Sequence, residues 1–391
     1  MANVSSSNGL EKRPKLRFPN FDEPWQSTLL SSVFAKNTKK NTDGQITNVI
    51  CNSAKQGLIP QREYFDKDIA NSDNTSGYYI IEENDFVYNP RKSSDAPYGP
   101  ISSYKYPDAG IVSPLYLCFR AKGAINPSFY EWYFRSSAWH RYVYMSGDSG
   151  ARHDRVSIKD DVFFAMPISI PSAREQEHIA SFLDMIDQRI DKQRALVDNL
   201  KKYKRGAIAY ILSGKSNEFD VEATWTEKTL ADLCCEFRSG RNISAALIHE
   251  SGDYPVYGGN GIRGYCDHYS HEGEYVVVGR QGALCGNVRL IQGQNYLSEH
   301  AIAVRANENN DTKFLLFLLD FMNLGQYSDQ GAQPGLAVNK LLRLKCNVPE
   351  KKTQSKISSF LLTFDRQIAA QESLLAFLTD QRKAFLQQLF I

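Results

Sequence analysis

The 391-residue sequence lacks the motifs by which most enzymes and metal sites are recognised. Its seven cysteines include no Cys-x-x-Cys pair, and there is no His-Glu-x-x-His, Gly-x-Ser-x-Gly, P-loop or protein-kinase signature. The Asn-Pro-Pro-aromatic tetrapeptide of amino-methyltransferases is absent too, with Asn89-Pro90-Arg91 the nearest match. These absences predict a chain with no catalytic residue and no metal site of its own.

Long apolar runs and a strong charge imbalance are also missing. No stretch approaches 18 apolar residues, so we expect no membrane span. Residues 1–15 have no apolar core and are predicted to be a disordered tail rather than a signal peptide. The odd cysteine count favours reduced thiols and hence a cytoplasmic protein.

The net charge is only +2, and residues 216–348 hold 11 basic against 16 acidic side chains. Charge alone therefore gives no case for nucleic acid. If the chain binds DNA, a local face must do so, with help from a more basic partner.

What the sequence does contain is a long internal repeat. Residues 171–213 align with residues 349–391 at a constant shift of 178, without a gap, and 11 of the 43 aligned positions are identical. A repeat of this kind decides the architecture, so it is considered before any local feature.

Both copies have the pattern of a coiled-coil helix, with apolar residues at alternating intervals of four and three. The polar exceptions fall at the same two places, Gln193 and Gln371, and Lys204 and Arg382. The predicted seam consists of Ile179, Leu183, Ile186, Ile190, Gln193, Val197 and Leu200 in the first copy and Ile357, Leu361, Phe364, Ile368, Gln371, Leu375 and Leu378 in the second.

The order of the segments predicts how the helices pair. The first helix leads into the second half of the chain and the second leaves it, so paired copies must be antiparallel. A polar residue in an apolar seam fixes register at some cost in stability, so Gln193 and Gln371 are expected to pack together. We predict an α+β fold in which two tandem-duplicated α/β modules are separated by two long antiparallel helices forming a coiled coil. The predicted segments are 1–15, 16–170, 171–215, 216–348 and 349–391.

The two modules resemble each other faintly. Short alternating runs between turn residues indicate strands, and an aromatic or leucine-rich run near residues 128–144 and 312–324 indicates a helix. The matching pieces are WQSTLL and WTEKTL, DFVYNPR and EYVVVGR, VSPLYLCFR and LSEHAIAVR, and FYEWYF and FLLFLL. Arg120 and Arg305 end the third pair, a position that suits a structural role.

These pieces resemble a known family. PSAREQEHIASFLDMIDQRI and its copy at Pro349 are similar to the two spacer regions of the DNA specificity subunits of type I restriction–modification enzymes. YPVYGGNGIRGY, VVVGRQGALCGNV, LSEHAIAV and GAQPGLAVNKL resemble the target-recognition domains of these subunits, and RFPNFDEPWQSTLL resembles their start. The resemblance covers roughly residues 16–391 and is weaker in the first module.

The resemblance implies a non-catalytic subunit that recognises a bipartite double-stranded DNA target, with one target-recognition domain, 16–170 or 216–348, for each half. It also implies spacer helices that dock two methyltransferase subunits, with restriction and translocase subunits joining. S-adenosylmethionine, ATP and Mg would belong to those partners, and this chain would bind no cofactor.

Base reading requires Arg, Lys, Asn or Gln at the groove edges. Polar loops supply such residues in both modules, although each is by itself more typical of a solvated or structural side chain. The candidates are Arg91, Lys92, Arg152, His153 and Arg155 in the first module and Asn260, Arg263, Arg280, Gln281 and Gln333 in the second.

Two alternatives stay open at this point. The low net charge also suits a two-headed scaffold that binds protein or glycan and no DNA. The glycines between Gly252 and Gly293 indicate turns, or else backbone brought close to a ligand such as a DNA phosphate.

Overall fold

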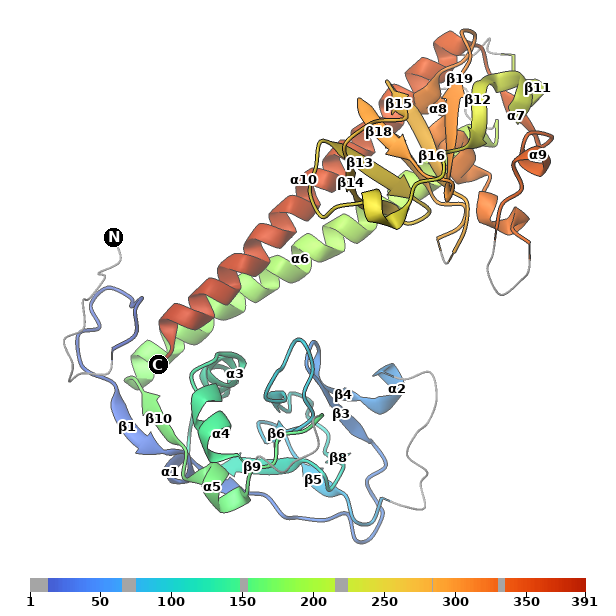
Figure 1. Cartoon of the computed structure of the whole chain (residues 1–391). Coiled ribbons are helices and arrows are strands. Elements are labelled where there is room, and N and C mark those ends of the chain that lie inside the picture. The colour runs from blue at the N-terminus through green and yellow to red at the C-terminus, as the bar shows by residue number, and fades with distance from the viewer. Residues whose placement is uncertain (1–12, 65–74, 148–153, 215–223, 283, 330–334) are drawn as a thin grey trace. The chain divides into compact units, whose positions relative to one another are not determined.

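The computed structural model describes residues 13–64, 75–147, 154–214, 224–282, 284–329 and 335–391, which fall into two compact units (Figure 1). Unit 1 contains Met1–Lys192 and Leu374–Ile391, and unit 2 contains Gln193–Ser373. The repeated segments form two long helices, α6 (Ala173–Leu212) and α10 (Lys351–Leu389). Each helix contributes one end to each unit. The predicted segment boundaries, which set the helices apart from the modules, stay a prediction.

Unit 1 is built on a four-stranded antiparallel sheet of order β2-β9-β6-β7. Its strands are β2 (Phe34–Lys36), β6 (Phe86–Tyr88), β7 (Ile101–Ser103) and β9 (Leu117–Ala121). Three strand pairs accompany it: β1 (Gln26–Leu29) with β10 (Pro167–Ile170), β3 (Ile50–Ser53) with β4 (Gly57–Pro60), and β5 (Tyr79–Ile81) with β8 (Gly110–Val112). The other helices are α1 (Leu30–Val33), α2 (Gln61–Tyr64), α3 (Pro127–Arg135), α4 (His140–Ser146) and α5 (Asp160–Phe164).

The sheet of unit 1 is buried on both faces, because alternate residues of a strand point to opposite sides. Phe86 and Phe119 join an aromatic core with Phe34 and α3. Val87 and Cys118 face the other way, into a smaller core formed with the β3–β4 and β5–β8 pairs. The alternation in the short strands therefore reflects two cores, while Ala35, Lys36 and Arg120 on β2 and β9 are exposed.

Unit 2 repeats this frame with a four-stranded antiparallel sheet of order β12-β19-β16-β17. Its strands are β12 (Cys234–Ser239), β16 (Tyr275–Gly279), β17 (Val288–Ile291) and β19 (Ala301–Ala306), and β11 (Thr226–Thr229) pairs with β20 (Lys345–Val348). A second, mixed sheet consists of β13 (Tyr254–Gly258), β14 (Gly261–Cys266), β15 (His271–Glu272) and β18 (Gln294–Leu297). The helical elements are α7 (Leu230–Leu233), η2 (Ala245–Leu247), α8 (Thr312–Phe321), η3 (Leu324–Tyr327) and α9 (Val338–Leu341).

The sheet of unit 2 also alternates between two cores. Val276 and Val278 pack towards the helices, while Tyr275 and Val277 face the second sheet. The sequence matches fall on equivalent elements of the two units, namely β1 and β11, β6 and β16, β9 and β19, and α3 and α8. The predicted tandem duplication is therefore confirmed.

The helices of the repeat run antiparallel, as predicted. In unit 2, Gln193 Nε2 donates to Gln371 Oε1 at 2.7 Å and to the Gln371 carbonyl at 3.0 Å, which confirms the predicted contact. In unit 1, the rings of Phe182 and Phe385 pack edge to face with centroids 5.0 Å apart. Partner numbers fall on one helix as they rise on the other, which is the antiparallel arrangement.

The second polar exception in the seam is explained by ion pairs. Lys204 Nζ lies 2.5 Å from Asp365 Oδ1 in unit 2, and Arg382 pairs with Asp187 in unit 1. Asp187 and Asp365 are equivalent in the repeat, as are Lys204 and Arg382. Every residue of the predicted seam is buried or half-buried.

Two further observations refine the sequence-based picture. The helix expected over residues 128–144 is interrupted after Arg135, because Ser136 Oγ and Trp139 Nε1 donate to the carbonyls of Tyr133 and Phe134. The part of the chain that the structure describes contains no helix long and apolar enough to span a membrane.

Candidate nucleic-acid interface

In unit 1, the loop after β6 pairs with a segment that is distant in the sequence. Arg91 forms an antiparallel bridge with Arg155, Lys92 N donates to the Asp154 carbonyl at 2.8 Å, and Val156 N donates to the Pro90 carbonyl at 2.9 Å. Arg91 and Lys92 are exposed, and Arg155 is half-buried. Three predicted DNA-contacting residues are therefore brought together by main-chain pairing.

A glycine makes this loop possible. Gly99 has a φ of +82°, and a Cβ at that position would lie 2.2 Å from the Asn89 carbonyl oxygen. The strand end is therefore pressed against a turn that admits no side chain. The other two unit 1 candidates, Arg152 and His153, lie outside the described residues.

Unit 2 repeats the arrangement at the end of β16. Gln281 forms an antiparallel bridge with Gly335, and Leu336 N donates to the Arg280 carbonyl at 2.9 Å. Arg280 and Gln281 are both half-buried. Arg280 is equivalent to Arg91 in the DFVYNPR and EYVVVGR match. Gln333 lies outside the described residues.

The turn between β13 and β14 lies against the same strand end. A Cβ at Gly259 would be 2.6 Å from the Gln281 carbonyl oxygen, so the two backbones are in direct contact. Asn260 and Arg263 on this hairpin are exposed. The four described candidates of unit 2 therefore come from two loops that touch.

Two of the candidate arginines differ from Arg120 and Arg305 in their side-chain contacts. Arg120 Nε is 2.6 Å from Asp85 Oδ1, and this hydrogen bond raises the pKa of the Arg120 guanidinium. The pKa of Arg305 is raised by its hydrogen bond to Tyr275. Arg91 and Arg263, by contrast, form no ion pair with any residue that the structure describes. Arg120 is structural, as predicted.

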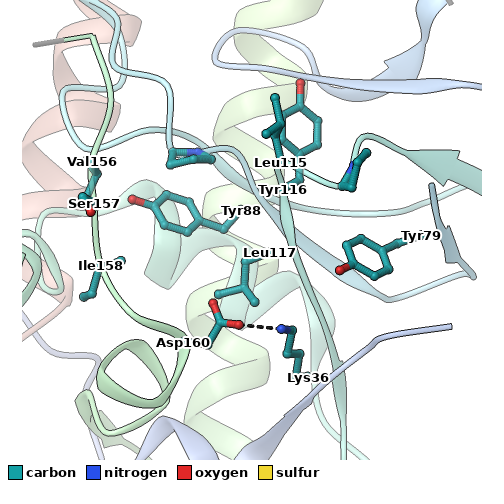
Figure 2. Close-up of a pocket in the computed structure, with 12 residues that line it drawn as sticks. Lys36, Tyr79, Tyr88, Leu115, Tyr116, Leu117, Val156, Ser157, Ile158 and Asp160 are labelled. Carbon is teal, nitrogen blue, oxygen red and sulfur yellow. Dashed lines mark hydrogen bonds and ion pairs between the residues drawn. The ribbon is translucent and has the colours of Figure 1, made fainter. Parts of the chain in front are cut away.

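A cavity of about 280 Å³ lies next to the pairing in unit 1 (Figure 2). Pro90 and Val156 line it together with Tyr88, and the ion pair of Lys36 with Asp160 closes one side. Burial raises the pKa of Tyr88, and its hydroxyl donates to the Tyr98 carbonyl at 2.8 Å. The walls present neutral hydroxyls, apolar surface and an internally neutralised ion pair, which suits a neutral group better than a phosphate.

Sequence reasoning missed two neighbours of Gln281, which are Glu299 and His300. His300 Nδ1 lies 2.7 Å from Gln281 Oε1, and His300 Nε2 lies 3.0 Å from Glu299 Oε1. These residues belong to the turn between β18 and β19. Their positions in the sequence do not reveal that they contact Gln281, because the contact depends on how β19 pairs with β16.

Comparison with known proteins finds relatives of part of the chain. The model of the "Type I restriction modification DNA specificity domain" matches residues 222–379. Over 159 residues the chain is 44% identical to the "Type I restriction enzyme EcoprrI specificity subunit" of Escherichia coli, covering 40% of this chain. The predicted resemblance to type I specificity subunits is confirmed. This match spans 38% of the length of that curated relative.

Solved structures extend the likeness in fold to nearly the whole chain. The type I S subunit from M. genitalium superposes with a TM-score of 0.63 at 17% identity, covering 97% of this chain and 99% of that one. A chain from a study of complex assembly and conformational transition of the type I R-M system gives a TM-score of 0.60 at 17% identity, covering 95% and 98%. The type I specificity-domain match includes all five candidate residues of unit 2.

Proposed function

We propose that this chain selects the DNA target of a type I restriction–modification enzyme, with each unit reading one half of a bipartite site. The observation that carries the proposal is the repeated loop pairing at the ends of β6 and β16. Both units present there polar side chains of the kinds that read base edges and contact phosphates, namely Arg91 and Lys92 in one and Arg280 and Gln281 in the other.

Exposed cations on the loops can contact DNA although the net charge of the chain is low. A chain of net charge +2 cannot hold DNA by a uniform field. Arg91, Lys92 and Arg263 are exposed on the loops and pair with no described carboxylate. A few exposed cations of this kind can help to select the DNA sequence. Most of the affinity for phosphates would come from partner subunits.

In this proposal, α6 and α10 set the distance between the two halves of the target and dock two methyltransferase subunits, which restriction and translocase subunits then join. S-adenosylmethionine, ATP and Mg would be bound by these partners in the cytoplasm. The uninterrupted helices of 40 and 39 residues support a spacing role, since each can extend roughly 60 Å at 1.5 Å per residue.

The test is to remove residues 190–196 and 368–374 together. These heptads are equivalent in the repeat and centred on Gln193 and Gln371, so the seam keeps its phase. Each helix shortens by roughly 10 Å, the rise of about three base pairs. We expect methylome sequencing to show the same half-sites with a gap shorter by about three base pairs.

The matched control is the full-length double variant Gln193→Leu, Gln371→Leu, which loses the polar contact and keeps the helix length. Its target gap should be unchanged. A gap that stays fixed in the deletion variant, with methylation intact, would rule out the spacing role. Failure of this chain alone to bind duplex DNA even at low salt, where phosphate contacts are strongest, would favour the scaffold without DNA instead.

A further inference from the structure

A short chain of hydrogen-bonding groups in unit 2 holds the side chain of Gln281. His300 contacts Gln281 Oε1 with Nδ1 at 2.7 Å and Glu299 Oε1 with Nε2 at 3.0 Å. Arg280 holds the Glu299–His300 turn next to Gln281, since Arg280 N donates to the His300 carbonyl at 2.9 Å and its side-chain Nη1 donates to the Glu299 carbonyl at 3.2 Å. Only the side-chain protons remain to be assigned.

The carboxylate decides where the imidazole proton lies. An ionised carboxylate can only accept hydrogen bonds, so His300 Nε2 must carry the hydrogen that faces Glu299. A neutral imidazole then has a lone pair at Nδ1, which can only accept. A half-turn of the Gln281 amide exchanges its oxygen and nitrogen in nearly the same volume. The amide therefore turns its NH₂ towards His300 and its oxygen away.

This orientation changes what Gln281 can recognise. A free glutamine amide reads adenine with both atoms, donating to N7 and accepting from N6. His300 engages one of the two amide hydrogens and holds the NH₂ against the ring, so the oxygen is the amide atom that Gln281 presents outward. In the major groove, adenine N6 and cytosine N4 are amino donors, whereas guanine O6 and thymine O4 are acceptors.

We propose that Gln281 is a specificity-determining residue that selects a base with an amino group, adenine or cytosine, over guanine or thymine at one position of the target. Glu299 and His300 are positioning residues that set this choice without touching the base. The inference rests on the proposed function, that unit 2 reads one half of a DNA site. It goes further by assigning one residue to one class of base.

Variants at Gln281 test the contact itself. Gln281→Ala removes the acceptor, so one position of one half-site should lose its preference for adenine or cytosine. Gln281→Glu keeps an acceptor of similar shape and should retain the preference. The expected loss of discrimination is about 5-fold to 10-fold in methylation rate, the lower part of the range for a base contact.

Glu299→Gln tests the positioning role. The new amide can donate to His300 Nε2 as well as accept from it, so the ring proton is free to move to Nδ1 and Gln281 is free to turn over. The same target position should then accept guanine or thymine as well. A residue that only stabilises the fold would lower methylation at all sites and leave the motif unchanged.

Matched controls come from a similar pair in the same unit. Gln294 Nε2 donates to Glu272 Oε1 at 3.3 Å, and both residues are exposed, with Glu272 before the start of β16 and Gln281 after its end. Gln294→Ala and Glu272→Gln should leave the motif as it is. Thermal melts of all variants would show that each is folded.

The readout is the methylated motif, determined by long-read sequencing of a host that carries the complete methylating system with each variant. The inference would be overturned if both Gln281→Ala and Glu299→Gln left the motif unchanged. It would also be overturned if Gln281→Ala relaxed a position at which the unaltered chain selects guanine or thymine. Failure of the proposed function would look different. In that case the host with the unaltered chain would show no sequence-specific methylation beyond that of a host without the chain.

Discussion

The two units share the arrangement of their central strands and differ in the side chains of their cores. Both have a two-stranded pair, a four-stranded antiparallel sheet and a helix on one face. Unit 1 fills the helix-side core largely with aromatic rings such as Phe34, Phe86 and Phe119, whereas unit 2 uses mainly aliphatic side chains such as Val276, Val304 and Leu315. The opposite face of the sheet carries separate strand pairs in unit 1 and a mixed four-stranded sheet in unit 2.

This contrast teaches which features of the duplication are constrained. The order and pairing of the central strands persist although the side chains have changed, because the alternation between two cores needs only apolar residues of fitting volume. The additions outside the central sheet have diverged completely. They adjoin the loops with the candidate DNA contacts, where two halves of a target would demand different chemistry.

The largest expected loss of stability follows from removing the buried partner of the strand arginine in unit 1. Asp85 is 1% exposed and accepts hydrogen bonds from Arg120, Asn37 and Glu82 N. Asp85→Ala removes a buried acceptor shared by three donors, of which Arg120 keeps Glu82 and Asn37 keeps the Ile80 carbonyl, and should destabilise unit 1 by about 2–3 kcal/mol. The equivalent strand arginine of unit 2, Arg305, instead lies over the ring of Tyr275.

Arg305→Ala should therefore cost only about 0.5–1 kcal/mol. Urea unfolding followed by tryptophan fluorescence and circular dichroism would measure both variants, with fluorescence weighted to unit 1 because Trp25, Trp132 and Trp139 lie there. Equal losses would contradict the expectation that the buried Asp85 contributes more stability than the contact of Arg305 with Tyr275.

An intermediate effect concerns the glutamine that the two spacer copies share. Gln176 Nε2 donates to the Pro171 carbonyl at 3.0 Å, and Gln354 Nε2 donates to the Pro349 carbonyl at 2.9 Å. Gln354 is 1% exposed and also bonds Asn310 Oδ1 and Asp311 N, at 2.8 and 2.9 Å.

Gln354→Ala should consequently cost about 2 kcal/mol, against about 0.5–1 kcal/mol for Gln176→Ala, since more buried groups lose their partners. Chemical denaturation of the two single variants gives the comparison directly. A larger loss for Gln176→Ala would contradict this ranking.

The smallest effect is expected at the repeated ion pairs. Lys204→Met removes the partner of Asp365 in unit 2, and Arg382→Met removes one of two arginines beside Asp187 in unit 1, since Arg135 Nη1 lies 3.4 Å from Asp187 Oδ2. These side chains are partly exposed, so each change should cost at most about 1 kcal/mol, and the two losses should be similar. The double-mutant cycles with Asp365→Asn and Asp187→Asn would measure each coupling. Coupling free energies that differ widely would show that the two ion pairs, although equivalent in the repeat, contribute unequally to stability.

Much of this fold was predictable because the repeat supplied long-range information that single residues lack. The heptad pattern gave both helices, and the matching polar exceptions led to the contact of Gln193 with Gln371. The partners of Lys204 and Arg382 were available as well, since Asp187 and Asp365 are identical in the two copies, but their facing positions required the register of the antiparallel pair.

The site was less predictable. Arg91 and Arg155 were both candidates, yet their bridge depends on a pairing across more than sixty positions of sequence. Glu299 and His300 gave no motif, because their role arises only when the turn before β19 meets the end of β16. The break after Arg135 was missed because Ser136 and Trp139 end the helix through hydrogen bonds to its carbonyls, which apolar periodicity does not report.

The composition of unit 1 has a consequence for how the protein is made. Leu389 and Phe390 are buried in its aromatic core, where Phe390 packs against Phe129 and Tyr133. Residues 374–391 are translated after unit 2, so unit 1 cannot close its core until the ribosome has passed unit 2. Unit 2, which is continuous from Gln193 to Ser373, can complete itself earlier. A premature stop directly after unit 2 would thus damage unit 1, although most of unit 1 is encoded before unit 2.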